Sequence, residues 1–282
     1  MNYGNISSTD QHFQAGYDTV NSTNYFSIPV HDENMLSNSS NVNVLGRWAF
    51  RVDGGPEEGI FYPYGDEDAK SPQSDDGSSP PIILLEPFVY FGRIYNTIYV
   101  NNNGDLTFDE PLYQWYPYYY STFSPRDIIA PLWTDIDIRW GGTISYREVT
   151  DTRLFERASR DINQCFPNLN FSASWVFIAT WDKVPYYMQR EAESTFQVVL
   201  VSGKNLSFTL MHYDYIAPTI YVESGYDTIN STEYFSIPVS DITNLAYTSN
   251  VNILGRWVFR VDKESENNGN ILYNIFFKYL KT

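Results

Sequence analysis

The run FVYFGRIYNTIYVNNNGDLTF, residues 88–108, alternates large apolar side chains with polar ones. Because successive side chains of a β-strand point to opposite faces, this two-residue period predicts strands with one buried face. Asn102, Asn103 and Gly104 tolerate a positive φ and therefore predict a hairpin turn. We predict strands at 87–91, 97–101 and 105–108.

Further strand signals along the chain predict a mainly β fold. Aromatic residues make up 17% of the chain and charged residues 18%, which suits half-buried strands better than helices or disorder. Two of the runs form a predicted hairpin around Gly203. We therefore expect an antiparallel β-sandwich-like domain. The runs lie at 127–149 (two strands around Gly141 and Gly142), 172–184, 194–203, 205–216, 234–239 and 256–261.

One amphipathic helix is predicted at residues 151–166, DTRLFERASRDINQCF. Asp151 can cap its first turn, and Pro167 ends it. Apolar side chains recur at helical spacing and form one stripe, which places Cys165 on the buried face as a core thiol rather than a nucleophile. The stripe consists of Leu154, Phe155, Ala158, Ile162, Cys165 and Phe166.

A long segment occurs twice: residues 16–53 recur as residues 225–262, identical at roughly seven positions in ten. This period is too long for a solenoid unit and predicts tandem copies of a whole domain. We expect residues 1–53 to be the C-terminal remnant of a preceding copy and residues 264–282 to be a tail. Residues 54–81 are dense in Gly, Pro, Asp and Ser, which predicts an irregular surface segment.

The charge balance narrows the range of partners and locations. A formal net charge of -16 without any Lys/Arg cluster argues against binding to nucleic acid or to acidic lipid. No stretch has the roughly eighteen apolar residues of a membrane span, and the first residues lack the apolar core of a signal peptide, so an exported protein would carry its signal upstream.

Six N-x-S/T triplets predict N-glycosylation and therefore an extracellular protein, secreted or part of an ectodomain. The alternative is an Asn/Ser-rich cytosolic protein whose triplets are never modified. The triplets begin at Asn5, Asn21, Asn38, Asn170, Asn205 and Asn230.

Candidate catalytic and metal-binding residues are few. Three histidines allow no triad to be argued, and no strand-Gly-helix phosphate cradle is present. Asp135 and Asp137 share one face of a predicted strand and could form an acid/base pair or bind calcium, which takes carboxylate oxygens. The alternative is a solvated strand face. More carboxylates lie in the segment 66–76, without the spacing of a twelve-residue calcium loop: Asp66, Glu67, Asp68, Asp75 and Asp76.

An aromatic run at 113–120 is the candidate interaction surface. Pro117 interrupts it and predicts a loop or sheet edge. Aromatic rings there could stack on sugars or on a protein partner; the alternative is that they only cover the sheet edge. Serial repetition favours binding or scaffolding, because multivalent contact increases affinity without new chemistry. The candidates are Trp115, Tyr116, Tyr118 and Tyr119.

Six motifs follow one another along the chain: IFYPYG (60–65), YNTIYVNNNGDLTF (95–108), IIAPLWTDIDIR (128–139), FIATWDKVPYY (177–187), TFQVVLV (195–201) and GRWVFRVD (255–262). Together they resemble the NIDO domain family, the nidogen extracellular domain. The resemblance implies a non-enzymatic module without a required cofactor that contacts extracellular matrix or cell-surface proteins in adhesion or matrix assembly, with self-association possible through repeats. It also implies a domain at 129–263 with an N-terminal extension at 54–128. The competing hypothesis is a calcium-dependent glycan-binding or glycan-processing domain using Asp135 and Asp137.

Overall fold

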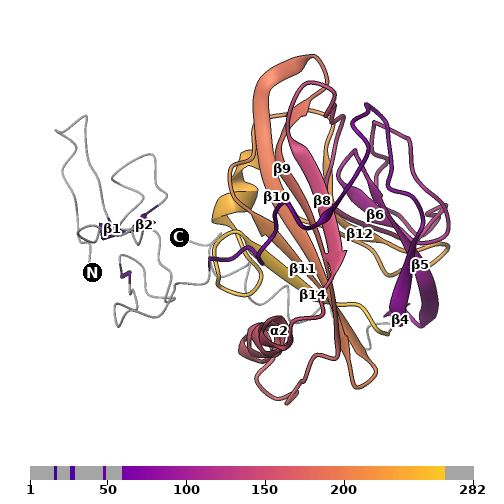
Figure 1. The fold of residues 1–282 in the computed structure, drawn as a ribbon, viewed down its shortest axis with the longest axis vertical. Helices are drawn as coiled ribbons and strands as arrows, with labels where there is room; N and C mark the ends of the chain where they lie inside the picture. Colours follow the sequence, from indigo (N-terminus) through magenta and orange to yellow (C-terminus); the bar gives the residue numbers. More distant parts are fainter. Residues whose placement is uncertain (1–15, 18–25, 29–46, 49–58, 264–282) are drawn as a thin grey trace.

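The computed structural model describes residues 16–17, 26–28, 47–48 and 59–263. Two six-stranded antiparallel sheets, here called sheet 1 and sheet 2, face each other (Figure 1). The predicted mainly β, antiparallel class is confirmed. In spatial order, sheet 1 contains β14 (Arg256–Arg260), β11 (Leu206–Tyr213), β10 (Gln189–Gly203), β9 (Trp175–Tyr186), β8 (Thr143–Glu148) and β3 (Ala69–Lys70). Sheet 2 contains β13 (Phe235–Ser236), β12 (Glu223–Asp227), β7 (Ile128–Trp133), β6 (Asp105–Thr107), β5 (Arg93–Asn101) and β4 (Ile82–Tyr90).

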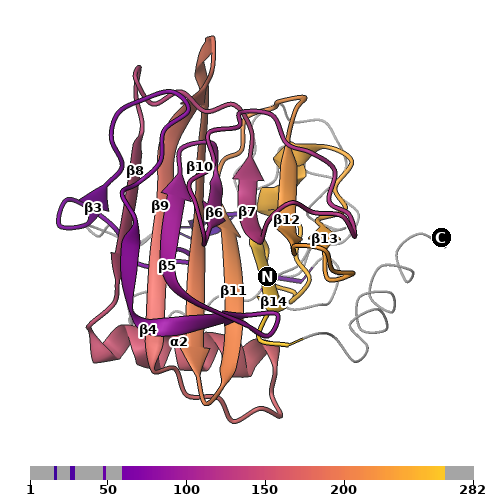
Figure 2. The ribbon, with the colours of Figure 1, turned by 90° about the vertical axis from the view of Figure 1, so that its right-hand side faces the viewer.

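Sheet 2 joins segments from both sides of the long connection at 108–127. Strands β4 to β6 precede this connection, whereas β7, β12 and β13 follow it (Figure 2). Strand β6 pairs with β7 through Leu106 opposite Ile129. The segment expected to be an extension therefore shares a sheet with the segment expected to be the domain, and the boundary at residue 129 stays a prediction.

The predicted hairpin turn after Asn101 is confirmed, since β5 and β6 pair from Asn101 opposite Asp105. Gly104 has φ +90°, and a Cβ there would lie 1.8 Å from the Leu132 carbonyl oxygen, so the position accepts only glycine. The strands predicted at 87–91 and 97–101 are shorter than the observed strands β4 and β5. Phe91 and Gly92 both have positive φ and form a two-residue turn, so β4 and β5 extend almost to each other.

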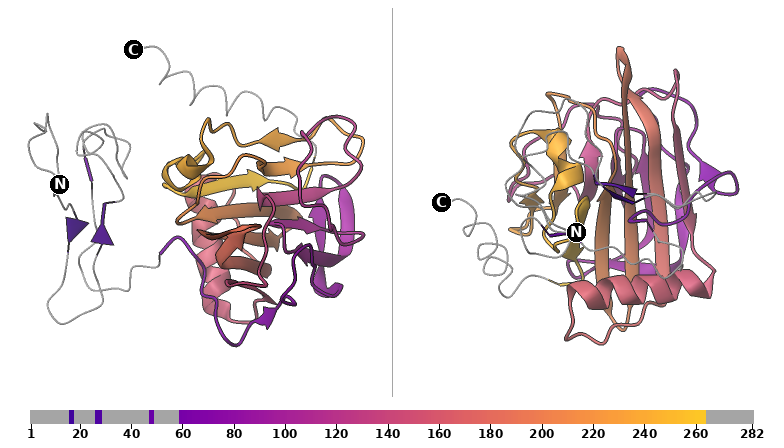
Figure 3. Two further views of the ribbon diagram at one scale, coloured as in Figure 1. Left: turned by 90° about the horizontal axis from the view of Figure 1, so that it is seen from above. Right: turned by 90° about the vertical axis from the view of Figure 1, so that its left-hand side faces the viewer.

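The predicted helix is confirmed as α2 (Thr152–Cys165). Asp151 caps it by accepting a hydrogen bond from the Arg153 backbone N–H. The helix lies crosswise on the strands of sheet 1, on the face away from sheet 2 (Figures 1 and 3). Ala158 and Ile162 are buried there in a cluster with Val176, Ile178 and other strand residues. No helix in the described ranges is long and apolar enough to cross a membrane.

The main core lies between the two sheets and is rich in aromatic rings. Trp181 and Phe196 stack on neighbouring strands with ring centroids 5.0 Å apart. Trp257 is fully buried near the sheet end, where Phe259 packs beside it. Rings of this size remove large apolar areas from water, which explains why a chain with so many aromatic residues folds as a two-layer structure.

Residues 134–139 depart from the predicted strand. Ile136 forms a single bridge with Tyr186, and no ladder continues beyond it. Ile136 and Ile138 are buried as the alternation predicts, but the side chain of Asp137 is also buried rather than solvated. The reason is local: Arg139 donates hydrogen bonds to both carboxylate oxygens of Asp137, which satisfies the charge away from bulk water.

Only short parts of the first copy of the repeated segment are described. Strand β1 (Gly16–Tyr17) pairs with β2 (Phe26–Ser27), Gly16 opposite Ser27. In the second copy, β12 pairs with β13 at the equivalent positions, Gly225 opposite Ser236. Most of the predicted remnant at 1–53 and all of the tail at 264–282 lie outside the described residues, so the partial repeat and the tail stay predictions.

Candidate functional site

The first candidate surface is the aromatic loop, residues 108–127, which connects β6 to β7. The loop is held by hydrogen bonds at several points. Leu112 N–H donates to Asn101 Oδ1 at 3.0 Å, and Trp133 Nε1–H donates to the Gln114 carbonyl oxygen at 3.0 Å. Ser121 N–H donates to an Asp227 carboxylate oxygen at 3.2 Å. A long connection without regular secondary structure is thus fixed in one shape.

Three of the four predicted contact residues face solvent from this loop: Trp115, Tyr116 and, at 91% exposure, Tyr119. Tyr118 instead packs edge-on against Trp133, with ring centroids 5.0 Å apart, and its hydroxyl lies 3.3 Å from Ser124 Oγ. Burial raises the pKa of Tyr118 to about 12. Tyr118 therefore anchors the loop and offers little of its ring to a partner.

Two further exposed rings on the same loop extend this surface. Tyr113 is exposed, and Phe123 exposes 85% of its surface although it carries no polar group. The predicted surface at 113–120 includes the first but omits the second. Phe123 stands apart from the dense Trp/Tyr run, so local composition gives no signal for it. Exposed apolar rings grouped on a fixed loop are typical of contact surfaces.

The second candidate surface is the acidic corner, formed by Asp75, Asp76, Asp135 and Asp137. Carboxylate oxygens of the first three lie within 4.8 Å of one another, which is close enough to share a cation. The segment 72–77 is held against the β5–β6 turn by Asn102, whose Nδ2 donates to the Ser74 carbonyl oxygen at 3.1 Å. The prediction paired Asp135 with Asp137; the structure adds the acidic segment to them.

The neighbouring Asn103 connects both halves of the acidic corner. Its Nδ2 donates to Asp76 Oδ1 at 2.9 Å, and its Oδ1 accepts from the Ile136 backbone N–H at 3.0 Å. The sequence gives no local signal for this convergence, because about sixty residues separate the two acidic segments and only the sheet brings them together. The run of three asparagines was recognised as a turn, whereas the role of its side chains was not.

The carboxylates of the acidic corner differ in protonation behaviour. Burial, followed by the charges of Asp76, Asp75 and Asp137, raises the pKa of Asp135 to about 6. Burial and the charge of Asp137 raise the pKa of Asp75 as well. Hydrogen bonds from Arg139 lower the pKa of Asp137, so this carboxylate is already neutralised. The two predicted residues are therefore unlike: Asp135 carries excess negative charge, and Asp137 is paired.

Arg139 also reaches Asp75, with Nη2 2.7 Å from Oδ2. The other oxygen of Asp75, Oδ1, is buried and accepts no hydrogen bond from any described residue. A carboxylate oxygen without a donor is costly to bury, and a bound cation or water would relieve that cost.

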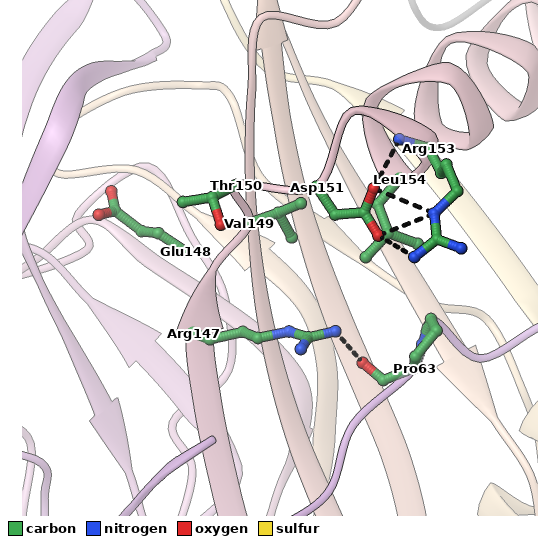
Figure 4. Close-up of a pocket in the computed structure, with 8 residues that line it drawn as sticks. All are labelled: Pro63, Arg147, Glu148, Val149, Thr150, Asp151, Arg153 and Leu154. Atoms are coloured by element: carbon green, nitrogen blue, oxygen red, sulfur yellow. Dashed lines mark hydrogen bonds and ion pairs between the residues drawn. The ribbon is translucent and has the colours of Figure 1, made fainter. Parts of the chain in front are cut away.

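A cleft of about 440 Å³ opens where α2 begins (Figure 4). Arg147 crosses its floor and donates to the Pro63 carbonyl oxygen at 2.7 Å. Asp151 and Arg153 form an ion pair at its rim, 2.8 Å apart. Arg147 also pairs with Asp68 at 3.4 Å, so each of these charged groups has an ionic partner.

The three predicted glycosylation sites in the described part of the chain are all exposed with positive φ, the last two within turns: Asn170, Asn205 and Asn230. Lys204 Nζ donates to the Asn170 carbonyl oxygen at 3.3 Å, so the first two lie at the same end of sheet 1. This accessibility is compatible with modification, and occupancy stays a prediction. Asn5, Asn21 and Asn38 lie outside the described residues.

In the described part of the chain, the cysteine and the histidine lie in packed surroundings. Burial raises the pKa of the Cys165 thiol to about 11, which keeps it protonated at neutral pH. His212 is fully buried, and burial together with the nearby Arg256 lowers its pKa well below the usual value. Neither group is poised for catalysis.

Comparison with known proteins relates these features to one family. A model of the nidogen-like domain (NIDO) matches residues 96–263. Alpha-tectorin of Mus musculus is 39% identical over 224 residues, which cover 72% of this chain and 10% of alpha-tectorin. Dendrite extension defective protein 1 of Caenorhabditis elegans is 31% identical over 189 residues, covering 64% of this chain and 16% of that protein. Nidogen-1 of Mus musculus is 24% identical over 242 residues, covering 71% and 19%.

The chain thus corresponds to between a tenth and a fifth of these relatives' length. No solved structure matches it.

Proposed function

Because this chain belongs to the nidogen-like (NIDO) domain family, we propose that it acts outside the cell as a non-enzymatic binding module in cell-matrix adhesion or matrix assembly. Its partners are extracellular matrix or cell-surface proteins, and binding is strengthened where several copies act together. Export is supported by the exposed sequons at Asn170, Asn205 and Asn230.

The observation that carries this proposal is the construction of the aromatic loop. Its exposed rings belong to a backbone fixed by hydrogen bonds from Leu112, Trp133 and Ser121. A partner that buries Trp115 and Tyr119 would remove large apolar areas from water without first ordering the loop. Rigid aromatic anchors of this kind dominate the affinity of protein interfaces.

The test compares a double variant, Trp115→Ala with Tyr119→Ala, with the unmodified chain in binding to decellularised matrix from cultured fibroblasts. We expect at least about a tenfold loss of bound protein, as for the removal of interface anchors. The control is Tyr215→Ala with Tyr221→Ala, which removes two exposed rings outside the aromatic loop and the acidic corner and should leave binding unchanged. Equal binding by both double variants and the unmodified chain would reject the loop as the contact surface.

A second candidate function, calcium-dependent glycan binding, is favoured by one observation: Asp75, Asp76 and Asp135 converge beside the unpartnered Asp75 Oδ1. Hard cations such as calcium take carboxylate oxygens, and sugars can bind through a protein-held calcium ion. The glycan-processing version has less support, because Asp137 is occupied by Arg139 and Asp135 therefore lacks a free acid/base partner.

Calorimetric titration of the full chain with calcium chloride tests this candidate. Binding should release or absorb heat, and Asp135→Asn should abolish the signal by removing one ligand. Asp66→Asn is the control, because Asp66 is a fully exposed carboxylate outside the group. An absence of heat in the unmodified chain would exclude the calcium version while leaving the aromatic loop untouched.

A further inference from the structure

Phe123 exposes 85% of its surface and, unlike the exposed tyrosines of the aromatic loop, has no hydroxyl to offer to water. Its backbone is nevertheless fixed. Phe123 N–H donates to Ser121 Oγ at 3.4 Å, and Ser124 N–H donates to the Ser121 carbonyl oxygen at 3.2 Å. A group that covers this ring would therefore remove apolar surface from water without first ordering the turn.

The open edge of sheet 1 shows how the chain itself can cover an incomplete part of its surface. Strand β14 pairs with a strand on one side only, β11 (Figure 2). On its other side, Asn250 takes the place of a strand: Nδ2 donates to the Val258 carbonyl oxygen at 2.8 Å, and Oδ1 accepts from the Val258 N–H at 2.9 Å. Among the described residues, no side chain covers Phe123 in this way, since its ring stays largely exposed.

The predicted glycosylation site at Asn230 adjoins the turn that carries Phe123. Ser124, the next residue along the loop, forms an isolated parallel bridge with Ile229. The Asn230 N–H donates to the Ser124 carbonyl oxygen at 3.2 Å. Consecutive Cα atoms are about 3.8 Å apart, so Phe123 lies one residue step from the residue that Asn230 contacts.

This junction is held in place on the β12 side as well. Ile229 N–H donates to Asp127 Oδ1 at 2.7 Å, and the Ile229 carbonyl oxygen accepts from Arg93 Nη2 at 2.9 Å. Asn230 itself is exposed with a φ of +51°, and Thr232, the third residue of its N-x-S/T triplet, is exposed too. A glycan on Asn230 would therefore start from a fixed point beside the exposed ring.

We propose that an N-linked glycan on Asn230 lays the apolar face of its first sugar ring on Phe123 and so holds the C-terminal end of the aromatic loop. A sugar ring carries C–H groups that can pack on an aromatic face, and the glycan keeps its hydroxyls in water. The covered ring is then closed to a protein partner, which leaves Trp115, Tyr116 and Tyr119 as the contact surface. The stacking does not depend on the proposed matrix role, whereas its effect on the contact surface does.

Melting temperatures of the full chain, secreted from mammalian cells behind an added signal peptide, test the stacking. Thr232→Ala removes the triplet but keeps Asn230, and it should lower the melting temperature by about 2–4 °C, as should Phe123→Ser. Both changes together should cost no more than either alone, because they remove the same contact.

Ser172→Ala is the matched control, because it removes the triplet at Asn170 by changing another exposed residue. The ring next to that site, Phe171, is buried in the cluster beneath α2 and is not available to a sugar. The effect of Ser172→Ala should therefore simply add to the effect of Phe123→Ser. Additive losses for Thr232→Ala and Phe123→Ser would overturn the proposal.

Mass spectrometry supplies two further measurements on the same secreted chains. Glycopeptides of the unmodified chain should show Asn230 occupied, and hydroxyl-radical footprinting should show Phe123 protected. Thr232→Ala should raise the oxidation of Phe123 several-fold and leave Tyr221 unchanged, because Tyr221 precedes β12 whereas Asn230 follows it. An unoccupied Asn230, or equal oxidation of Phe123 in both chains, would contradict the stacking.

Binding to decellularised matrix separates this inference from the proposed function. In the glycosylated chain, Phe123→Ser should leave binding unchanged, whereas the double variant of Trp115 and Tyr119 should reduce it. A loss with Phe123→Ser as large as that of the double variant would mean that a partner covers this ring instead of the glycan, and the inference would fail. If no variant changes binding, the proposed function fails, and the melting temperatures alone decide the stacking.

Discussion

The aromatic loop and the acidic corner depend on the same turn but present opposite chemistry. Asn101 holds the loop by accepting a hydrogen bond from Leu112, whereas Asn102 and Asn103 hold the acidic segment. All three asparagines are fully buried. The loop exposes aromatic rings, whereas the corner gathers carboxylates around the guanidinium of Arg139.

Hydrogen bonds that fix a backbone in one shape do not by themselves give every charged side chain nearby a partner. In the loop, hydrogen bonds from Leu112, Ser121 and Trp133 fix the backbone, and the side chains that remain exposed include several aromatic rings. In the corner, Asp75 Oδ1 has no donor among the described residues, and the pKa of Asp135 is raised. A partner for the loop would have to be apolar or aromatic, whereas a partner for the corner would have to be cationic.

The largest expected effect is at Gly104, which follows the three asparagines and supports both surfaces. Gly104→Ala should reduce the free energy of unfolding by about 3–4 kcal/mol, because its Cβ would collide with the Leu132 carbonyl. Gly92→Ala is the control: its φ of +79° is also positive, but nothing lies within 4 Å, so only about 1 kcal/mol should be lost. Urea unfolding measures both, and equal losses would show that strain alone matters.

Replacing Asn101 should affect only the aromatic loop, and replacing Asn103 should affect only the acidic corner. Asn101→Ala and Asn103→Ala should each cost about 2–3 kcal/mol, because each leaves a buried backbone N–H without its acceptor. Hydrogen-deuterium exchange should then accelerate at Leu112 in the first variant and at Ile136 in the second. Asn96→Ala, an exposed position on β5, should change neither. Faster exchange at both Leu112 and Ile136 in either variant would show that the turn and the two surfaces open together rather than separately.

A smaller, pH-dependent effect should separate the two predicted carboxylates. The pKa of Asp135 is raised from 3.8 to about 6, so its ionisation weakens the fold, and this loss develops as pH rises from about 4 to about 6. Asp135→Asn should therefore be more stable than the unmodified chain at pH 7, with the difference vanishing near pH 4.

Asp137 should behave in the opposite way. Its pKa is lowered, so its stabilisation is present above about pH 4 and is lost as pH falls further. Asp137→Asn should be less stable than the unmodified chain at pH 7, with a smaller difference at low pH. Urea midpoints at the two pH values measure both variants; the same sign for both would contradict the finding that Arg139 pairs with Asp137 and not with Asp135.

The smallest effect should come from the exposed rings themselves. Tyr119→Ala should leave the free energy of unfolding within about 0.5 kcal/mol, because its ring contacts solvent. Tyr118→Ala should cost more, about 1–2 kcal/mol, since it removes the ring packed on Trp133. Thermal denaturation distinguishes them. A large loss for Tyr119→Ala would mean that this residue supports the loop instead of facing a partner.

The sequence predicted features whose causes lie within a few residues. The alternation around β5 and β6, the cap at Asp151 and the stripe of α2 are local, and each was confirmed. The end of the strand after Trp133 was not predicted, because it depends on how Arg139 turns back to Asp137. The acidic corner and the inward packing of Tyr118 arise from contacts between distant segments, which local patterns do not encode.

Asn250 has a consequence for behaviour in crowded solution. By satisfying both backbone groups of Val258, it leaves that part of the sheet without a free ladder on which another sheet could grow. A one-residue substitute for a strand therefore protects a long, strongly apolar sheet against open-ended aggregation. Asn250→Ala would expose those two backbone groups. Its expected effect is lower solubility at high protein concentration, with the packing of the core unchanged.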